Sequence, residues 1–149
     1  MEKKCVGLFP YGRKEEKVLE TIRFLDHTMD ATAFVHGICG IFALALNNKF
    51  GYPIYYIETT EEDDGYEYEQ LVHIFCMKDN MYIDIRGMTT EEDSFFVEFN
   101  DFLDSGSRIL DTSQEECLLF VKESMSEEEY DIFLRAAESI IDEHMDWYY

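Results

Sequence analysis

A segment that is apolar almost all round its circumference places the strongest constraint on how this chain can fold. It runs from Cys39 to Phe50, and the strong helix formers from Ala43 to Leu46 predict a helix. A helix without a polar face has no side that can meet water, so we expect it to be central and buried. Gly51 and Pro53 follow directly and predict where this helix ends. The rest of the chain must therefore supply the layers that cover it.

Three segments after this helix have the composition of β-strands. They are rich in β-branched and aromatic side chains and cover residues 53–58, 66–77 and 81–86. The acidic residues 59–65 predict a loop between the first two strands. Residues 78–80 predict a tight turn between the last two. We expect these strands to form a small antiparallel sheet.

Helical periodicity marks the chain on both sides of the strand region. Apolar side chains recur every three or four positions in residues 14–28, 90–103 and 126–145. The last two segments begin with capping boxes, formed by Thr89 with Glu92 and by Ser126 with Glu129. The apolar run 117–121 is compatible with a strand or a helix, and residues 104–113 with a loop or a short strand. Residues 1–149 are expected to form one α+β domain with a helical C-terminus.

The charge of the chain limits the partners that it can bind. The formal net charge is −21 and the sequence pI is about 4.3. Such a surface repels nucleic-acid backbones and anionic membranes and attracts a protein or peptide with a basic surface. Solubility, an acidic proteome and mimicry of a nucleic acid are three readings of the same charge. Mimicry would let the protein occupy the basic groove of a partner.

The cysteines and histidines predict neither a disulfide framework nor a metal site. The four cysteines are widely spaced and form no CxxC pair, and the N-terminus has no signal-peptide pattern. We therefore expect reduced thiols in a cytoplasmic protein. The four histidines show no zinc-binding spacing, so no metal and no cofactor are expected.

Cys39 stands where a glycine-containing loop enters the apolar helix. The first turn of a helix offers unpaired N–H groups and a partial positive charge, which favour a thiolate. The same N–H groups can stabilise the oxyanion of an acyl-transfer intermediate. Gly37 and Gly40 leave the sulfur uncrowded. Cys39 is therefore a candidate nucleophile, and the alternative is a small buried residue at the start of a core helix.

His73 and Asp84 lie within apolar strand segments, where an unpaired charge is costly. If the two-residue turn is Lys78-Asp79, the antiparallel register places His73 opposite Asp84. If the turn is Asp79-Asn80, His73 opposes Arg86, and Asp84 is its diagonal neighbour on the same face. A three-residue turn would place the pair on opposite faces. Both tight registers predict a His–Asp pair, which is either structural or the base and orienting acid of a nucleophilic site.

The order of these residues resembles the papain-like superfamily, and within it the transglutaminase-like cysteine proteins. It is also similar to small phage and bacterial proteins with a GxCxxFAxAL helix, present here at residues 37–46. The resemblance covers residues 30–88. It implies that Cys39 is the nucleophile, His73 the general base and Asp84 the orienting acid.

The oxyanion donor is less familiar, because no glutamine precedes Cys39. Its own backbone N–H would serve, with Thr32 or His36 beside Gly37 as further oxyanion or cleft candidates. His36 as an exposed loop residue is the alternative.

The sequence therefore predicts a cysteine-dependent hydrolase or acyltransferase acting on an amide bond of a protein or peptide. Protease, deamidase and transglutaminase activity share the acyl-enzyme step and remain open. The competing hypothesis is a non-catalytic acidic protein that inhibits or blocks a basic partner.

Overall fold

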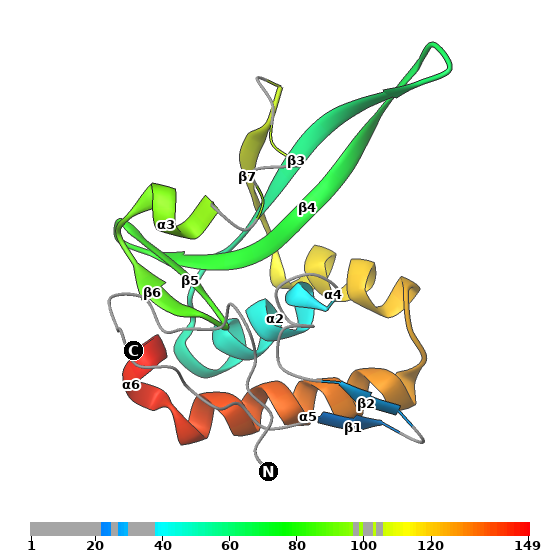
Figure 1. Cartoon of the computed structure of the whole chain (residues 1–149). Helices are drawn as coiled ribbons and strands as arrows, with labels where there is room; N and C mark the ends of the chain where they lie inside the picture. Colours follow the sequence, from blue (N-terminus) through cyan, green and yellow to red (C-terminus); the bar gives the residue numbers. More distant parts are fainter. Residues whose placement is uncertain (1–21, 25–26, 30–37, 97–98, 100–102, 104–105) are drawn as a thin grey trace.

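The computed structural model describes residues 22–24, 27–29, 38–96, 99, 103 and 106–149 (Figure 1). Five strands form one antiparallel sheet, namely β3 (Ile54–Asp63), β4 (Tyr66–Lys78), β5 (Met81–Asp84), β6 (Gly87–Thr89) and β7 (Arg108–Thr112). The helices are α2 (Cys39–Phe50), α3 (Glu92–Phe96), α4 (Gln114–Glu123), α5 (Glu127–Glu143) and α6 (Met145–Tyr148). A separate strand pair consists of β1 (Ile22–Phe24) and β2 (His27–Met29). The class is α+β, as expected.

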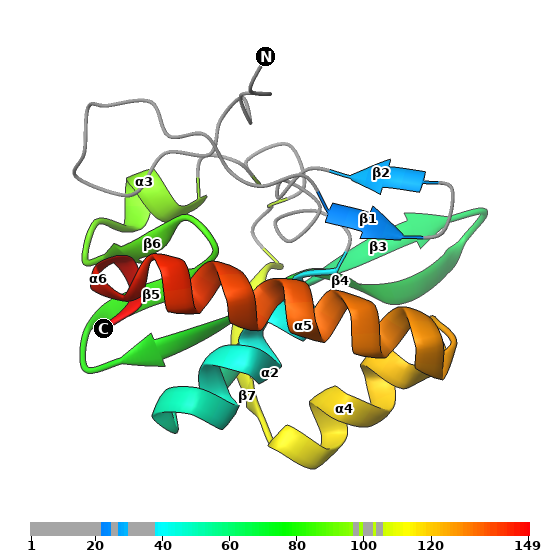
Figure 2. The same cartoon turned by 90° about the horizontal axis from the view of Figure 1, so that it is seen from below.

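Helix α2 is the centre of the molecule. Every residue from Cys39 to Leu46 is buried, which confirms the prediction from its apolar circumference. The helix lies between the sheet and α5, with α4 beside it (Figures 1 and 2). Gly51 ends it in the left-handed conformation, with φ of 75°, and donates its N–H to the carbonyl of Asn47. The bounds of α2 are those that the sequence predicts.

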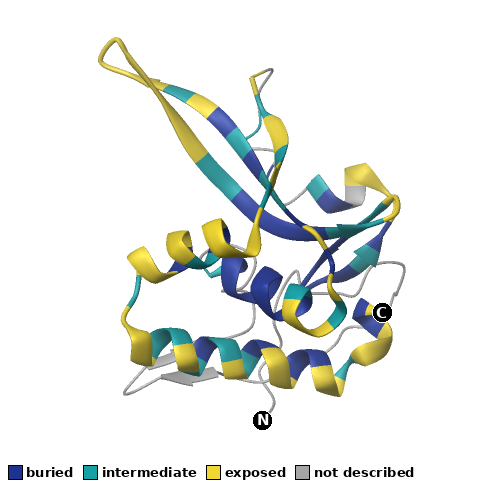
Figure 3. Ribbon diagram, turned by 180° about the vertical axis from the view of Figure 1, so that it is seen from behind, coloured by how far each residue is buried: buried dark blue, intermediate teal, exposed yellow. Residues whose placement is uncertain are grey.

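Strands β3 and β4 form a hairpin that extends far beyond the body of the molecule (Figure 1). The acidic residues predicted as a loop over 59–65 are mostly strand, because β3 continues to Asp63 and the turn is confined to Asp64 and Gly65. The β-branched Thr59 and Thr60 favour the extended backbone in spite of the charges that follow. The far half of this hairpin is exposed (Figure 3).

The turn between β4 and β5 sets the position of Asp84 relative to His73. Lys78 pairs with Met81, so the two-residue turn is Asp79-Asn80. This is the second of the two tight registers considered above. It places His73 and Asp84 diagonally on one face of the sheet.

A β-bulge divides the β3–β4 hairpin. Ile57 pairs with His73 and Glu58 with Leu71, so Val72 is an extra residue on β4. A bulge bends its strand and changes the direction of neighbouring side chains. Here it stands immediately before His73.

Two helix predictions differ from the structure. Residues 22–24 and 27–28 of the predicted helix 14–28 lie in strands β1 and β2, since Ile22, Phe24 and Thr28 favour extended backbone. The other residues of that segment lie outside the described part. Within the helix predicted over 90–103, α3 covers Glu92–Phe96 and begins two residues later than predicted. The hydroxyl of Thr89 accepts the N–H of Glu91 instead of Glu92.

The C-terminal helices follow their caps. Ser113 caps α4, which settles the open segment 117–121 as helix, and residues 108–112 form strand β7. The capping box of Ser126 and Glu129 begins α5, as predicted. Helix α5 lies along the side of α2 that faces away from the sheet (Figure 2).

Candidate functional site

Cys39 is the first residue of α2 and is 7% exposed. Its sulfur accepts a hydrogen bond of 3.3 Å from the backbone N–H of Ile74 on β4. The first turn of α2 contains no acidic residue, and Ile38 supplies no side-chain cap. The positive end of the helix and the Ile74 N–H therefore both lie next to the sulfur.

His73 is fully buried beside this sulfur and is held by one carboxylate. Its Nε2 lies 2.9 Å from Oδ2 of Asp84, so Nε2–H donates to the carboxylate. This bond fixes the ring orientation and leaves Nδ1 as the nitrogen that can exchange a proton. Among the described residues, Nδ1 makes no hydrogen bond of ordinary geometry.

Arg86 completes the buried polar group, and the sequence analysis did not identify it as a site residue. Its Nε and Nη2 lie 3.1 and 2.6 Å from Oδ2 of Asp84, and its backbone N–H donates to Oδ1 at 2.8 Å. Its Nη1 donates to the carbonyl of Phe95 at 3.0 Å. In the sequence Arg86 follows Asp84 by two positions within the segment predicted as strand, whereas in the structure β5 ends at Asp84 and Arg86 lies in the turn that follows.

Aromatic rings enclose the His73–Asp84–Arg86 group. The His73 ring stacks on Phe99 with centroids 4.4 Å apart and lies 6.0 Å from the parallel ring of Phe75. The Arg86 guanidinium lies over Phe95 and Phe99, at 4.9 and 5.2 Å from their centroids. Cation–π contacts of this kind stabilise a desolvated positive charge. The rings also exclude water, which strengthens every charge interaction inside.

Opposing effects set the protonation of His73 and Asp84. Burial alone would lower the pKa of His73, but the hydrogen bond with Asp84 and the adjacent Cys39 outweigh it and raise the pKa to about 9. Burial alone would raise the pKa of Asp84, but Arg86 and His73 hold it well below its usual range. At neutral pH the imidazole is therefore charged and the carboxylate ionised.

The other described cysteines have different surroundings. Cys76 donates its S–H to the carbonyl of Ala43, at 3.4 Å, in the core, and burial raises its pKa. Burial, with a smaller effect of Cys39, raises the pKa of Cys117 to about 12. Both thiols are neutral at physiological pH and 3% exposed or less. Cys39 differs from the two cysteines expected to be core residues in its place at the start of a helix and in its contact with His73.

A cavity of about 230 Å³ lies next to Cys39, between the start of α2, strand β4 and helix α4. Its lining is mostly apolar and includes Leu71, Val72 and Phe120. Cys39 is one of the residues that line this cavity. The site is neither a surface patch nor a sealed core position.

Several predicted features fall outside the described residues or have no counterpart within them. Thr32, His36 and Gly37 lie outside the described part of the chain, so their places in the site are not assigned. Among the described residues, no group of three or more His, Cys, Asp or Glu side chains is arranged to hold a metal ion. None of the helices described here combines the length and apolarity that crossing a bilayer requires.

No protein-family model, curated protein or solved structure matches the chain.

Proposed function

We propose that the protein is a cysteine-dependent hydrolase or acyltransferase, with a single papain-like or transglutaminase-like domain over residues 1–149. One observation carries the proposal: the helix-opening thiol of Cys39 lies beside a buried imidazole whose far nitrogen is bound to Asp84. A nucleophile, a base and a group that orients the base are the parts that acyl transfer requires.

His73 is the proton acceptor for the Cys39 thiol in this reaction. Its pKa is raised to about 9 by the hydrogen bond with Asp84 and by the adjacent Cys39, against the opposing effect of burial. The thiol proton passes to Nδ1, the ring nitrogen that Asp84 does not hold. Asp84 is itself paired with Arg86.

The reaction begins with attack of the Cys39 sulfur on an amide carbonyl, which forms an S–C bond and a tetrahedral oxyanion. In this proposal the oxyanion is stabilised by the backbone N–H groups of Cys39 and Gly40 in the first turn of α2. As the C–N bond breaks, His73 transfers a proton from Nδ1 to the leaving amine. A thioester and a neutral imidazole remain. Asp84 keeps the ring oriented throughout.

The acceptor of the acyl group decides the net reaction. Water, activated by the neutral His73, hydrolyses the thioester and gives protease or deamidase activity. An amine acceptor gives transamidation. Both routes restore the Cys39 thiol and share every residue named above.

Alkylation by iodoacetamide tests the activated thiol directly. Cys39 should react at least about tenfold faster than Cys76 and Cys117 at neutral pH, since a thiolate is the reactive form. Peptide mass spectrometry of partly alkylated protein measures all three rates in one sample. The variant His73→Gln should slow Cys39 and leave the other two rates unchanged. Equal rates at all three cysteines would overturn the proposal.

A second candidate function rests on the exposed hairpin. Residues 60–69 carry six acidic side chains and no basic one. Tyr66 and Tyr68 stand among them, 76% and 50% exposed. Carboxylates beside exposed aromatic rings suit a partner rich in arginine or lysine. A non-catalytic protein that blocks a basic partner would use this surface.

Two variants distinguish the enzyme from the blocking protein. If the protein acts by blocking, Cys39→Ala keeps its biological effect, and Glu61→Gln/Glu67→Gln weakens it in a salt-dependent way. If it acts as an enzyme, Cys39→Ala abolishes the effect.

A further inference from the structure

We infer that Cys39 stands at one end of an extended substrate groove whose other end selects a basic side chain. The inference rests on the proposed function and names its substrate class: a peptide or protein segment with an apolar residue near the reacting amide and an arginine or lysine further along.

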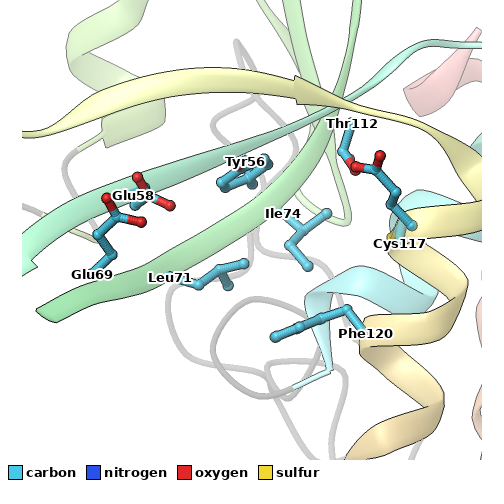
Figure 4. Close-up of a pocket in the computed structure, with 9 residues that line it drawn as sticks. Tyr56, Glu58, Glu69, Leu71, Ile74, Thr112, Cys117 and Phe120 are labelled. Carbon is cyan, nitrogen blue, oxygen red and sulfur yellow. The ribbon is translucent and has the colours of Figure 1, made fainter.

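Two neighbouring cavities make up this groove. The cavity beside Cys39 and a second cavity of about 330 Å³ share three lining residues, Leu71, Ile74 and Phe120. These three residues form the apolar middle of the groove (Figure 4). Phe120 is 47% exposed, so this lining residue of both cavities is accessible from solution.

The far end of the groove is acidic. Glu58 of β3 and Glu69 of β4 lie side by side there (Figure 4), and Glu116 of α4 lines the same cavity. Glu58 is the least accessible of these, with 13% of its side chain exposed. A carboxylate pair in a partly enclosed site attracts a cation more strongly than the same pair on an open surface.

Arg108 of β7 shows what this end can hold. Its Nε lies 2.9 Å from Oε1 of Glu58, and its Nη2 lies 2.8 Å from Oε1 of Glu69. The two carboxylates thus already bind a guanidinium between them. Arg108 itself is half exposed, so a basic side chain of a substrate has access to displace it or to join it at Glu116.

The strand spacing gives the length of the segment. Glu69 precedes Ile74, whose N–H contacts the Cys39 sulfur, by five positions on β4. At about 3.3 Å per residue this separates the two ends by roughly 15 Å. An extended peptide covers that distance with about four or five residues. The basic residue should therefore stand about that far from the reacting amide.

Protection of Cys39 from iodoacetamide tests the groove. The probe is a blocked alanine peptide with one leucine and, four or five positions before or after it, one arginine. The matched control peptide has glutamate in place of arginine. We expect the arginine peptide, in at least one of its placements, to slow alkylation at about tenfold lower concentration than the glutamate peptide.

Two protein variants with opposite expected effects sharpen the test. Glu58→Gln/Glu69→Gln should remove the preference for arginine, and Arg108→Ala should strengthen it by exposing both carboxylates. Glu128→Gln/Glu138→Gln changes the net charge equally at exposed positions of α5 and should leave the preference intact. Equal protection by the arginine and glutamate peptides would overturn the proposed groove. So would a loss of the arginine preference in Glu128→Gln/Glu138→Gln as large as in Glu58→Gln/Glu69→Gln.

The outcome for the groove stays distinct from that for the enzyme. Fluorescence anisotropy of the labelled peptides reports binding whether or not Cys39 is reactive. Arginine-selective binding with unreactive Cys39 would refute the enzyme alone. Rapid alkylation without arginine selectivity would refute the groove alone.

Discussion

The two ends of the β3–β4 hairpin differ in where their charged side chains lie: they are buried and paired at one end and exposed at the other. At the root, formed by residues 54–57 and 73–76, His73 is fully buried and paired with Asp84. At the tip, formed by residues 60–69, six acidic side chains stand in or near solvent without one basic residue among them. The same two strands thus run from a buried end to an exposed end (Figure 3), and at the exposed end Glu69 is paired with Arg108 of β7. The candidate site lies at the root, and the acidic surface lies at the tip.

The largest expected difference between the two ends comes from removing one carboxylate at each. Asp84→Asn removes the buried carboxylate that pairs with both Arg86 and His73 and should lower the free energy of unfolding by about 3–5 kcal/mol. Asp63→Asn at the tip should change it by less than about 0.5 kcal/mol. Urea unfolding of both variants measures the contrast. Similar changes in the free energy of unfolding for the two variants would show that the buried Asp84 stabilises the fold no more than an exposed carboxylate does.

Alkaline pH should act on the root next most strongly. The raised pKa of His73 stabilises the fold fully below pH 6.5, and this contribution is lost as pH rises through about 9. The loss should be on the order of 3 kcal/mol, the size of the pKa change expressed as free energy. Unfolding at pH 6 and pH 9.5 measures it in the wild type and in His73→Gln, which should lack it. Glu67→Gln at the tip should behave as the wild type, and a pH slope that survives in His73→Gln would contradict the assignment.

Two glycines allow a comparison of steric restraint beside the root with backbone restraint at the tip. Gly40 of α2 lies against the root, and Gly65 lies in the turn of the tip. A Cβ on Gly40 would lie 2.7 Å from Cγ2 of Val121 and 3.1 Å from Cδ1 of Ile74, so Gly40→Ala should cost about 1–3 kcal/mol. Gly65 has φ of 82° and open space around it, so Gly65→Ala should cost about 1 kcal/mol through its backbone alone. Thermal unfolding gives both values. Gly65→Asn should recover part of the second loss, whereas Gly40→Ser should be no better than Gly40→Ala.

The smallest expected effect is a gain at the tip. Glu62 and Glu67 are directly opposed across the strands, and both are exposed. Like charges in this position destabilise a hairpin, so Glu67→Lys should raise the free energy of unfolding by roughly 0.2–1 kcal/mol. The gain should shrink as salt screens the pair. A gain that does not depend on salt would show that charge repulsion is not its cause.

The difference between root and tip also explains which parts of the structure the sequence predicted. Both end residues of helix α2 were predicted, because the long apolar segment marks the helix and Gly51 marks where it ends. The sequence also narrowed the His73–Asp84 contact to two registers, since parity depends only on the length of the turn. It did not predict strand in residues 59–63, where charge suggested a loop and cross-strand pairing decided the backbone. It also passed over Arg86, because the need for a second partner of Asp84 follows from the depth of burial, which single residues do not reveal.

The extra residue at Val72 shifts the alternation of faces along β4. On a regular strand, two residues an odd number of positions apart point to opposite faces. One inserted residue reverses that rule across the insertion. Leu71 and Ile74 stand three positions apart on either side of Val72, and both line the same two cavities. The insertion thus joins the apolar lining of the two cavities along one strand.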